Sequence, residues 1–366
     1  MSNERPPVPP TYRPAEPEPG PRTVAPRVPR PVPPRLEQLA ARHPLVIAAV
    51  IVAVTVTWTT AVLTGVAFGA SSWWIFDILT SYRPQYTLVL AIAVVTLAVL
   101  RCWRSLAVAV VALALNVVVV APVFTQHQAA PRSGSPTLTI AHLNLQSRTG
   151  DLAAMDRWLD SGPADVVVLL HTTDRTANHL AGGVGPYRMI YPVFAGLNNN
   201  LKRVYEPSAE VIVVTDRPDV TASVPTLGGL PIDAVNIEAR IGSTRVSLLG
   251  CHTLSPGTGA RYDTRNEELD AIGRWLRSTR RPAIAFGDFN VTYYSPSFQH
   301  LLHLGHATSS QLGFGIQATW PHQFRPAGIA IDQSVYTGPI TAVARYRGPS
   351  LGSEHRALIV RYALTG

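Results

Sequence analysis

Residues 283–290 read Ala-Ile-Ala-Phe-Gly-Asp-Phe-Asn, an apolar run that a glycine closes before two polar side chains, Asp288 and Asn290. An uninterrupted apolar run of this length, bounded by glycine, is typical of a short buried strand. Asp and Asn that follow a strand are commonly turn formers. They are also hydrogen-bonding groups, and beside other polar strand ends they could form one site.

The sequence on both sides of this stretch alternates short apolar strands with longer amphipathic helices. Leu269, Ile272 and Leu276 recur at helical spacing in one of the helices. The predicted helices are 152–161 and 261–280, and the predicted strands are 138–144, 166–171, 210–215, 234–241, 246–252, 283–287, 331–336 and 357–362. Many strands with a few helices indicate a layered α/β or α+β fold.

The N-terminal part has a different composition. Residues 1–44 hold 14 prolines and seven arginines. With so few large apolar residues, the segment cannot bury enough surface to offset its chain entropy, which predicts a disordered tail. We interpret it as a solvated cytoplasmic tail, and the alternative is a ligand for a proline-binding partner.

Three apolar runs, almost free of charge, follow at about 45–69, 82–100 and 106–124. At about 1.5 Å per residue, a run of about 20 residues crosses a bilayer core of roughly 30 Å. The runs therefore predict three transmembrane helices over residues 45–124, and the alternative is three buried helices of a soluble domain. Residues 125–136 are polar, with Pro, Gly and Ser, and are interpreted as a linker.

The placement of the arginines predicts the orientation in the membrane. The tail is rich in arginine, and Arg101 and Arg104 lie between the second and third runs, whereas the first connection carries Arg83, offset by Asp77. Positively charged loops favour the cytoplasmic side. We therefore expect a multi-pass cell-membrane protein with a cytoplasmic N-terminus and an extracytoplasmic C-terminal domain.

The formal net charge of +8 reflects the N-terminal part of the chain. Residues 134–366 hold 20 Lys and Arg against 18 Asp and Glu, so this region gives no special weight to DNA binding. Cys102 and Cys251 lie in unrelated surroundings, one between two apolar runs and one within an apolar strand. A disulfide between them is not expected, and a cysteine metal site is excluded.

Polar side chains stand at the ends of several predicted strands. Carboxylates, amides and imidazoles gathered on adjacent strand ends could form one catalytic or metal-binding site. Besides Asp288 and Asn290, the candidates are Asn144, His252, Asp332, Glu354 and His355.

Six motifs of this region resemble those of the endonuclease/exonuclease/phosphatase family, in the family's order. They are 139–144 (TIAHLN), 164–170 (ADVVVLL), 249–252 (LGCH), 287–290 (GDFN), 331–333 (IDQ) and 352–355 (GSEH). The family includes pancreatic-type deoxyribonucleases, abasic-site endonucleases, sphingomyelinases and inositol-phosphate phosphatases. The resemblance implies a domain at 137–366 with a four-layer α/β/β/α sandwich, here preceded by the three transmembrane helices.

The resemblance also implies a metal-dependent phosphoester hydrolase, with Mg²⁺ as the first choice and Mn²⁺ as the second. Such a reaction needs an activated water and neutralisation of the developing phosphorane charge. Asp288 would orient or deprotonate water, and Asn290 would donate to the phosphoryl oxygen or the nucleophile. His355, with Asp332 fixing its tautomer, would contact phosphate or act as acid or base.

Further roles are implied on the same basis. His252 would donate to a phosphate oxygen from the opposite side, and Glu210 would pair with it, although an edge charge is an equal reading of Glu210. Asn144 and Glu354 would be metal ligands. Arg265, at a position that is often basic in the family, is interpreted as structural or solvated.

The sequence departs from the family at one metal position. Thr172 stands where the family places a metal-binding glutamate, and a neutral hydroxyl is a poor ligand for Mg²⁺. Two other differences are milder: Glu354 stands where the family usually has an Asp, and Gln333 stands where it commonly has a His. Either the metal is bound weakly through Asn144, Glu354 and Asp332, or His171 or Asp174 substitutes and shifts the preference toward Mn²⁺ or Zn²⁺, or the domain is weakly active or inactive.

Two functions follow from the sequence. The first is a membrane-anchored phosphodiesterase, nuclease or phosphatase with an extracytoplasmic catalytic domain. The second is a weakly active or inactive member that binds a phosphorylated ligand at the cell surface. The substrate could be nucleic acid, a lipid head group or a small phosphoester, because specificity lies in the loops. The sequence leaves the protein partners unknown.

Overall fold

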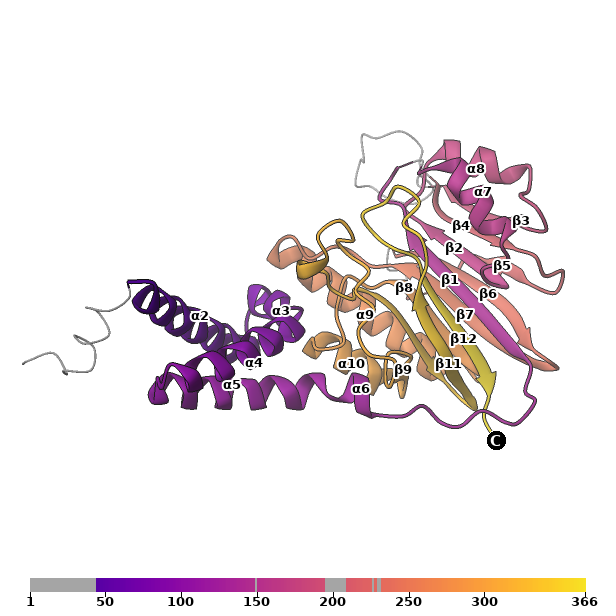
Figure 1. Cartoon of the computed structure of the whole chain (residues 1–366). Helices are drawn as coiled ribbons and strands as arrows, with labels where there is room; N and C mark the ends of the chain where they lie inside the picture. Colours follow the sequence, from indigo (N-terminus) through magenta and orange to yellow (C-terminus); the bar gives the residue numbers. More distant parts are fainter. Residues whose placement is uncertain (1–43, 149, 195–208, 226, 229–231) are drawn as a thin grey trace, which may run out of the picture. The chain divides into compact units, whose positions relative to one another are not determined.

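The computed structural model describes residues 44–148, 150–194, 209–225, 227–228 and 232–366. Its C-terminal part contains two six-stranded sheets (Figure 1). The first has the order β11 (Ile340–Arg347), β12 (Leu358–Leu364), β1 (Thr137–Asn144), β2 (Val166–Leu170), β4 (Ala209–Thr215) and β3 (Arg188–Phe194). The second has the order β5 (Thr221–Ser223), β6 (Asp233–Ile241), β7 (Thr244–His252), β8 (Ala283–Asp288), β10 (Asp332–Thr337) and β9 (Thr308–Ser309).

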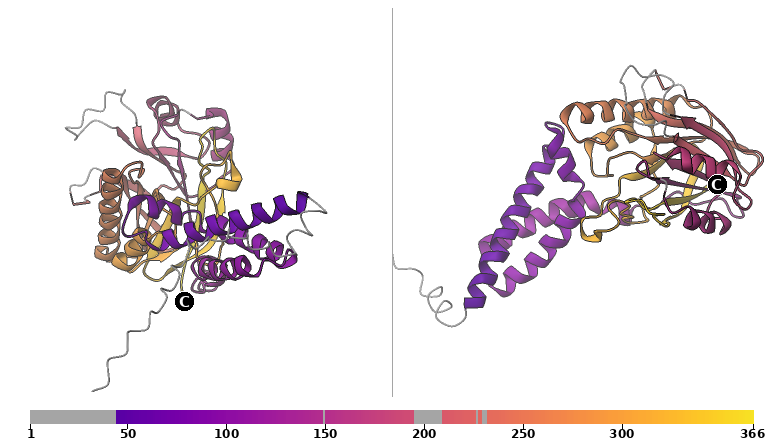
Figure 2. Two further views of the ribbon diagram at one scale, coloured as in Figure 1. Left: turned by 90° about the vertical axis from the view of Figure 1, so that its left-hand side faces the viewer. Right: turned by 90° about the horizontal axis from the view of Figure 1, so that it is seen from above.

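The two sheets pack face to face, and helices cover their outer faces (Figure 2). Helices α7 (Leu152–Asp160) and α8 (Asp174–Ala181) share a core with the first sheet. Helices α9 (Gly259–Ser278) and α10 (Pro296–Gly305) share a core with the second. The predicted α/β/β/α sandwich is therefore confirmed.

Alternation along the strands decides which side chains meet between the sheets. In β1, Ile140 belongs to the core between the sheets and Ala141 to the core under α7 and α8. Because side chains alternate with a period of two, Asn144 is on the side of Ile140. The same parity puts Asp288 on the side of Phe286, which also lies between the sheets. The polar strand ends thus extend the inner layer of the sandwich.

All the strands that the sequence predicts are present, within one or two residues of the expected bounds. The sequence did not predict β3, β5, β9, β11, α8 or α10. Strand β3 contains a proline and is paired irregularly with β4, so its pattern is weak. Strand β11 has a register shift between Ala342 and Ala344, which interrupts the alternation that would reveal it.

The apolar helices are α2 (Pro44–Phe68), α4 (Arg83–Val99) and α5 (Trp103–Val120), with the short helices α3 (Trp74–Thr80) and α6 (Pro122–Thr125) next to them. Among the described residues, α2 and α5 are each long and apolar enough to cross a membrane. Helix α4 meets this condition only together with α3, from which it is bent by 61°. By length and composition alone, the described part of the chain contains two candidate spans, or three if the bent pair is one span. The tail at 1–43 lies outside the described residues.

Residues 126–136 form no helix and no named strand, but they are tied to the domain. The side chain of Gln128 donates to the backbone carbonyls of Ser309 and Leu312 and accepts from the hydroxyl of Tyr336. Farther along, the Arg132 amide donates to the carbonyl of Leu364. The segment that was interpreted as a linker therefore packs against the sandwich.

Gly287 is the glycine on which the site strands depend. Its φ is +142°, and a Cβ at this position would lie 1.8 Å from the backbone oxygen of Cys251 on the neighbouring strand. We expect Gly287→Ala to lower the free energy of unfolding by more than about 3 kcal/mol, because backbone must move to relieve the overlap. Denaturant unfolding of the full chain in detergent, followed by near-UV circular dichroism, measures the loss.

Gly162→Ala is the matched control. Gly162 also has a positive φ, +63°, but nothing lies within 4 Å of the added Cβ. Its substitution should cost about 1–2 kcal/mol, the backbone term alone. Equal losses in the two variants would contradict the role of close approach at Gly287.

Candidate active site

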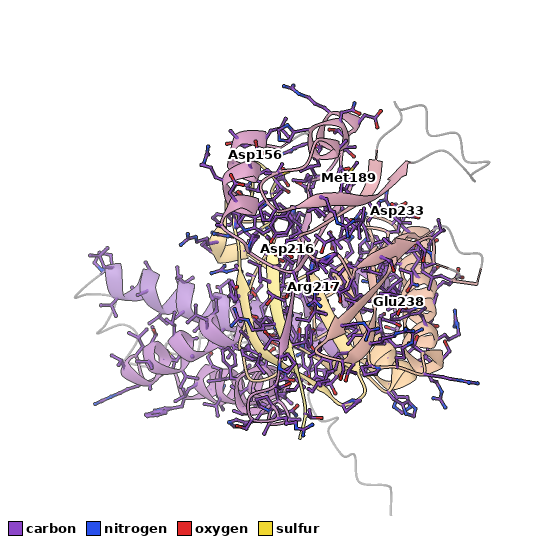
Figure 3. The ribbon with its side chains drawn as sticks, turned by 90° about the vertical axis from the view of Figure 1, so that its right-hand side faces the viewer. Asp156, Met189, Asp216, Arg217, Asp233 and Glu238 are labelled. Carbon is purple, nitrogen blue, oxygen red and sulfur yellow. The ribbon has the colours of Figure 1, made fainter. Side chains whose placement is uncertain are left out.

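Backbone pairing in the second sheet aligns four polar residues in one row. In the register, Asp233 of β6 is opposite His252 of β7, His252 is opposite Asp288 of β8, and Asp288 is opposite Asp332 of β10. Figure 3 labels Asp233 and Glu238, which share strand β6. The row brings together strand ends that are 99 residues apart between Asp233 and Asp332.

The carboxylate of Asp288 is at the centre of the row. It is buried, and its Oδ2 accepts a hydrogen bond of 2.8 Å from the Nδ2 of Asn144, at the end of β1 in the other sheet. The same oxygen is 3.8 Å from Nε2 of His252 and 3.7 Å from Nε2 of His355. These two separations are too long for direct hydrogen bonds but suit a bridging oxygen atom. The structure therefore gathers four of the predicted site residues around one oxygen.

His355 and Asp332 form a buried pair. The Nδ1 of His355 is 2.9 Å from Oδ2 of Asp332, as the sequence predicts for a carboxylate that fixes the tautomer. Burial lowers the pKa of His355, but the charges of Asp332 and Asp288 outweigh it and raise this pKa to about 9. Burial raises the pKa of Asp332, and the two neighbouring imidazoles outweigh it and hold the pKa well below its usual range. At neutral pH, His355 is an imidazolium that directs Nε2 toward Asp288.

His142 is a site residue that the sequence analysis missed. It is buried in β1, two residues before Asn144 and on the same face. Its Nε2 is 3.5 Å from the Oδ1 of Asp332, and neither atom has a hydrogen-bond partner in the described part of the chain. A lone histidine in the otherwise apolar stretch 140–143 was the available signal. Asp332 thus lies between two imidazoles.

Asn290 adopts a left-handed backbone conformation, with φ of +48°. Its amide donates to Oδ1 of Asp288 at 2.9 Å, and its Nδ2 donates to the carbonyl of Thr253 at 2.8 Å. Gln333, next to Asp332 on β10, faces the other way and donates to the carbonyls of Val291 and Ala330. The change from His to Gln therefore affects the loop after Asn290 and not the central carboxylate.

The position of the missing glutamate is buried. Thr172 is fully buried and does not line the cavity at the site, whereas His171 does, with its ring 5.1 Å from that of His252. Asp174, the other substitute, begins α8 and is not among the cavity-lining residues. Glu210 lies at the start of β4, and its side chain is outside the described residues.

Glu354 is next to His355 in the chain, but it contacts other partners than the group of Asn144, His252, Asp288, Asp332 and His355, here called the central group. Its carboxylate accepts from Arg148 at 3.1 Å and from Gln146 at 3.5 Å. The hydrogen bond from Gln146, followed by that from Arg148, holds the pKa of Glu354 below its usual value. Glu354 is thus a charged acceptor at neutral pH, but one that is already paired.

Three residues of the central group could hold a metal ion. Asp288, Asp332 and His355 each offer one ligand atom, and these atoms lie within 4.8 Å of one another. The Oδ1 of Asp332, a buried carboxylate oxygen without a hydrogen bond, is the kind of atom that a hard cation would satisfy. The donor set therefore fits a divalent ion, although the sequence predicted Asn144 and Glu354 as its ligands.

The sequence pattern of one family matches residues 141–355, which is more than half of the chain, and it is described as the Endonuclease/Exonuclease/phosphatase family. The chain belongs to this family. A search of curated proteins finds no match to the whole sequence.

Several solved structures are similar to this chain at low sequence identity. A family member from Beutenbergia cavernae is 16% identical, with 63% of this chain and 72% of that chain covered and a TM-score of 0.47. D. rerio TDP2, complexed with a single-strand DNA product, is 14% identical, with 62% and 98% covered and a TM-score of 0.48. Sphingomyelinase C from Streptomyces griseocarneus is 15% identical, with 62% and 99% covered and a TM-score of 0.44.

This family member has a cavity of about 480 Å³ at the site. The walls include the central group, the loop after β7 and the start of α9, together with residues of α3 and the turn after it. Five of the predicted site residues line this cavity: Asn144, His252, Asp288, Asn290 and His355.

Glu268, on α9, is a buried carboxyl group in the cavity wall. Burial raises its pKa from 4.5 to about 7, although the Leu254 amide donates to it. Between pH 4.5 and 7 the folded chain therefore holds a proton that the unfolded chain has lost. Protonated Glu268 therefore contributes its full stabilisation of the fold below about pH 4.5. This contribution is lost as the pH rises through about 7, and the free energy of unfolding falls by roughly 3 kcal/mol at most.

Glu268→Gln should remove this part of the pH dependence, because the amide does not titrate. We expect the variant to gain stability relative to the wild type as the pH rises from 4.5 to 8, in thermal unfolding of the full chain in detergent. Asp263→Asn, an exposed acid on the same helix, should leave the wild-type slope unchanged. A Glu268→Gln variant with the wild-type slope would contradict the assignment.

Proposed function

We propose that the protein is a membrane-anchored, metal-dependent phosphoester hydrolase. The observation that carries the proposal is the convergence of Asn144, His252 and His355 on one carboxylate oxygen of Asp288 inside a cavity. Family membership supports the same chemistry. The substrate is a phosphoester: nucleic acid, a lipid head group or a small molecule.

Asp288 is the residue that would orient the attacking water and take up its proton. Its Oδ2 has two imidazoles at 3.7–3.8 Å, so a water or phosphoryl oxygen between them would have charged or polar groups on each side. The protonated His355 would donate from Nε2 to a phosphoryl oxygen, while Asp332 holds Nδ1. His252 would donate from the neighbouring strand, and Asn290 would position the loop and the phosphoryl group.

Mg²⁺, or alternatively Mn²⁺, would neutralise charge on the phosphoryl oxygen and favour ionisation of a bound water. Asp288 and Asp332 would hold the ion through carboxylate oxygens, with Asn144 and Glu354 as further oxygen donors; the protonated His355 has no free lone pair and would serve as the hydrogen-bond donor instead. The buried Thr172 supplies no carboxylate to this site, so we propose weaker metal binding than a site with the family's glutamate.

The buried Thr172 also supports a second function. Without the family's carboxylate, the same cavity would bind a phosphorylated ligand with little or no turnover. The imidazolium of His355 and the imidazole of His252 serve binding as well as catalysis. The two functions differ in turnover, which the following experiment measures.

We expect the full chain in detergent to hydrolyse bis-p-nitrophenyl phosphate with Mg²⁺ or Mn²⁺ and to lose this activity with a chelator. Asp288→Asn and His355→Gln should each lower kcat/KM by at least about 100-fold, because each removes a group that transfers a proton or stabilises charge. His303→Gln, an exposed histidine on α10, should have wild-type activity.

Equal rates in the wild type and the two site variants would overturn the hydrolase proposal. Binding of inorganic phosphate without turnover would support the second function. A screen over nuclease, phospholipase and phosphatase substrates then distinguishes the three substrate classes.

We further propose that the apolar helices anchor the chain in the cell membrane, with the N-terminus cytoplasmic and the catalytic domain outside. The length and composition of α2 and α5, and of the bent pair α3 and α4, support anchoring. The side assignment comes from the arginines, with Arg101 and Arg104 between α4 and α5.

Epitope tags at the two ends of the chain test this orientation. In intact cells, added protease should remove the C-terminal tag and leave the N-terminal tag until the membrane is opened. Three spans predict opposite accessibility for the two ends. Equal accessibility, which two spans would give, would refute the proposed arrangement.

A further inference from the structure

Asp77 is a buried carboxylate on the short helix α3, which lies between α2 and α4 in the chain. Helix α3 reads Trp-Ile-Phe-Asp-Ile-Leu-Thr, so Asp77 is its one charged residue. The Oδ2 of Asp77 accepts from Nη2 of Arg265 at 2.9 Å, and its Oδ1 accepts from the hydroxyl of Ser295 at 2.6 Å. Both oxygens of an acid from the helical region are therefore used by residues of the catalytic domain.

Arg265 is buried, with 1% of its surface exposed. Of the two interpretations of Arg265, structural or solvated, its burial excludes the solvated one. Besides Asp77, it reaches the catalytic loop, because its Nη1 donates to the backbone carbonyl of Asn290 at 2.9 Å. The guanidinium also lies 4.9 Å from the ring centre of Tyr262. Arg265 thus connects the carboxylate of Asp77 to the backbone of Asn290.

The backbone of Asn290 needs to be held. The left-handed region is uncommon for residues other than glycine, although asparagine is among those that tolerate it best, and φ of Asn290 is +48°. Its amide and its side chain are held by Asp288 and Thr253, and its carbonyl is held by Arg265. Without Asp77, Arg265 would lose its ion-pair partner among the described residues and would rearrange toward water or the neighbouring Glu268 carboxyl.

The same segment contributes to the cavity. Asp77, Ile78, Ser81 and Tyr82 are among the residues that line it, next to Arg265. Ser81 also has its hydroxyl 3.5 Å from that of Thr292, in the loop after Asn290. Helix α3 and the turn after it therefore form part of the wall of the cavity.

We infer that Asp77 is a positioning residue of the hydrolase site, which acts through Arg265 on the loop that carries Asn290. The inference rests on the proposed function for its effect on turnover. The hold of Asp77 and Arg265 on the loop after β8 does not depend on turnover. The catalytic domain and the segment between the spans form one functional unit.

A double-mutant cycle in the full chain in detergent tests the effect on turnover. Asp77→Asn should lower kcat by about 10-fold to 100-fold with KM changed less than about 3-fold, because a misplaced catalytic group costs rate more than binding. In an Asn290→Ala background, Asp77→Asn should lower kcat further by less than about 3-fold, since the side chain that it positions is gone. Asp77→Glu should restore part of the rate.

Asp270→Asn is the matched control. Asp270 is on α9 in an ion pair with His300, with 36% of its side chain exposed, and its substitution should leave kcat within about 2-fold. A purely structural attachment would give Asp77→Asn the same fold-loss in both backgrounds. That additive result would overturn the inference.

Hydrogen–deuterium exchange decides the case if the wild type is inactive on every substrate, which would count against the proposed function alone. Asp77→Asn should speed exchange in the peptide covering residues 288–295 by at least about 10-fold, while peptides from β1 and β12 remain as in the wild type. Asp270→Asn should change neither. Unchanged exchange at 288–295 in Asp77→Asn would overturn the inference whether or not the protein is active.

Discussion

The register of the second sheet is the constraint on which the site depends. Pairing of β6 with β7, of β7 with β8 and of β8 with β10 puts Asp233, His252, Asp288 and Asp332 side by side. A slip of one residue in any pair would turn a polar group into the opposite layer, because side chains alternate with a period of two. Gly287 secures the register of β7 and β8, since the Cys251 oxygen occupies the space that a side chain would need. The chemistry of the cavity is thus fixed first by backbone pairing.

The electrostatics of the site follow from the same arrangement. Two buried carboxylates, Asp288 and Asp332, face imidazoles from three other strands or loops: His142, His252 and His355. In a region of low dielectric constant, unbalanced carboxylates would be costly. Protonation of His355 lowers this cost and creates the cation that a phosphoryl group requires. The stability of the site and its affinity for an anion therefore have a common origin.

The apolar patterns of the sequence predict the strands and helices that have a regular alternation. The ordered motifs predict the sandwich. Asn144, His252 and Asp288 end apolar runs and His355 precedes one, and their convergence is what adjacent strand ends predict. His142 stands out in the sequence only as a lone histidine in an apolar stretch, which is too weak a signal to assign it to the site. The Asp77–Arg265 pair joins residues 188 positions apart, and no spacing rule connects them. The burial of Thr172 and the pairing of Glu354 with Arg148 likewise depend on tertiary contacts.

The position of Asp77 has a consequence for how the protein is made. Chains are synthesised from the N-terminus, so Asp77 leaves the ribosome long before Arg265 and Ser295 exist. Until then its charge has no buried partner, and an ionised carboxylate is costly in the hydrocarbon core of a membrane. Helix α3 would therefore wait at the watery boundary and take its final place only when the nascent domain supplies the guanidinium. Under the proposed membrane anchoring, the last step in placing α3 would therefore follow the folding of the C-terminal domain.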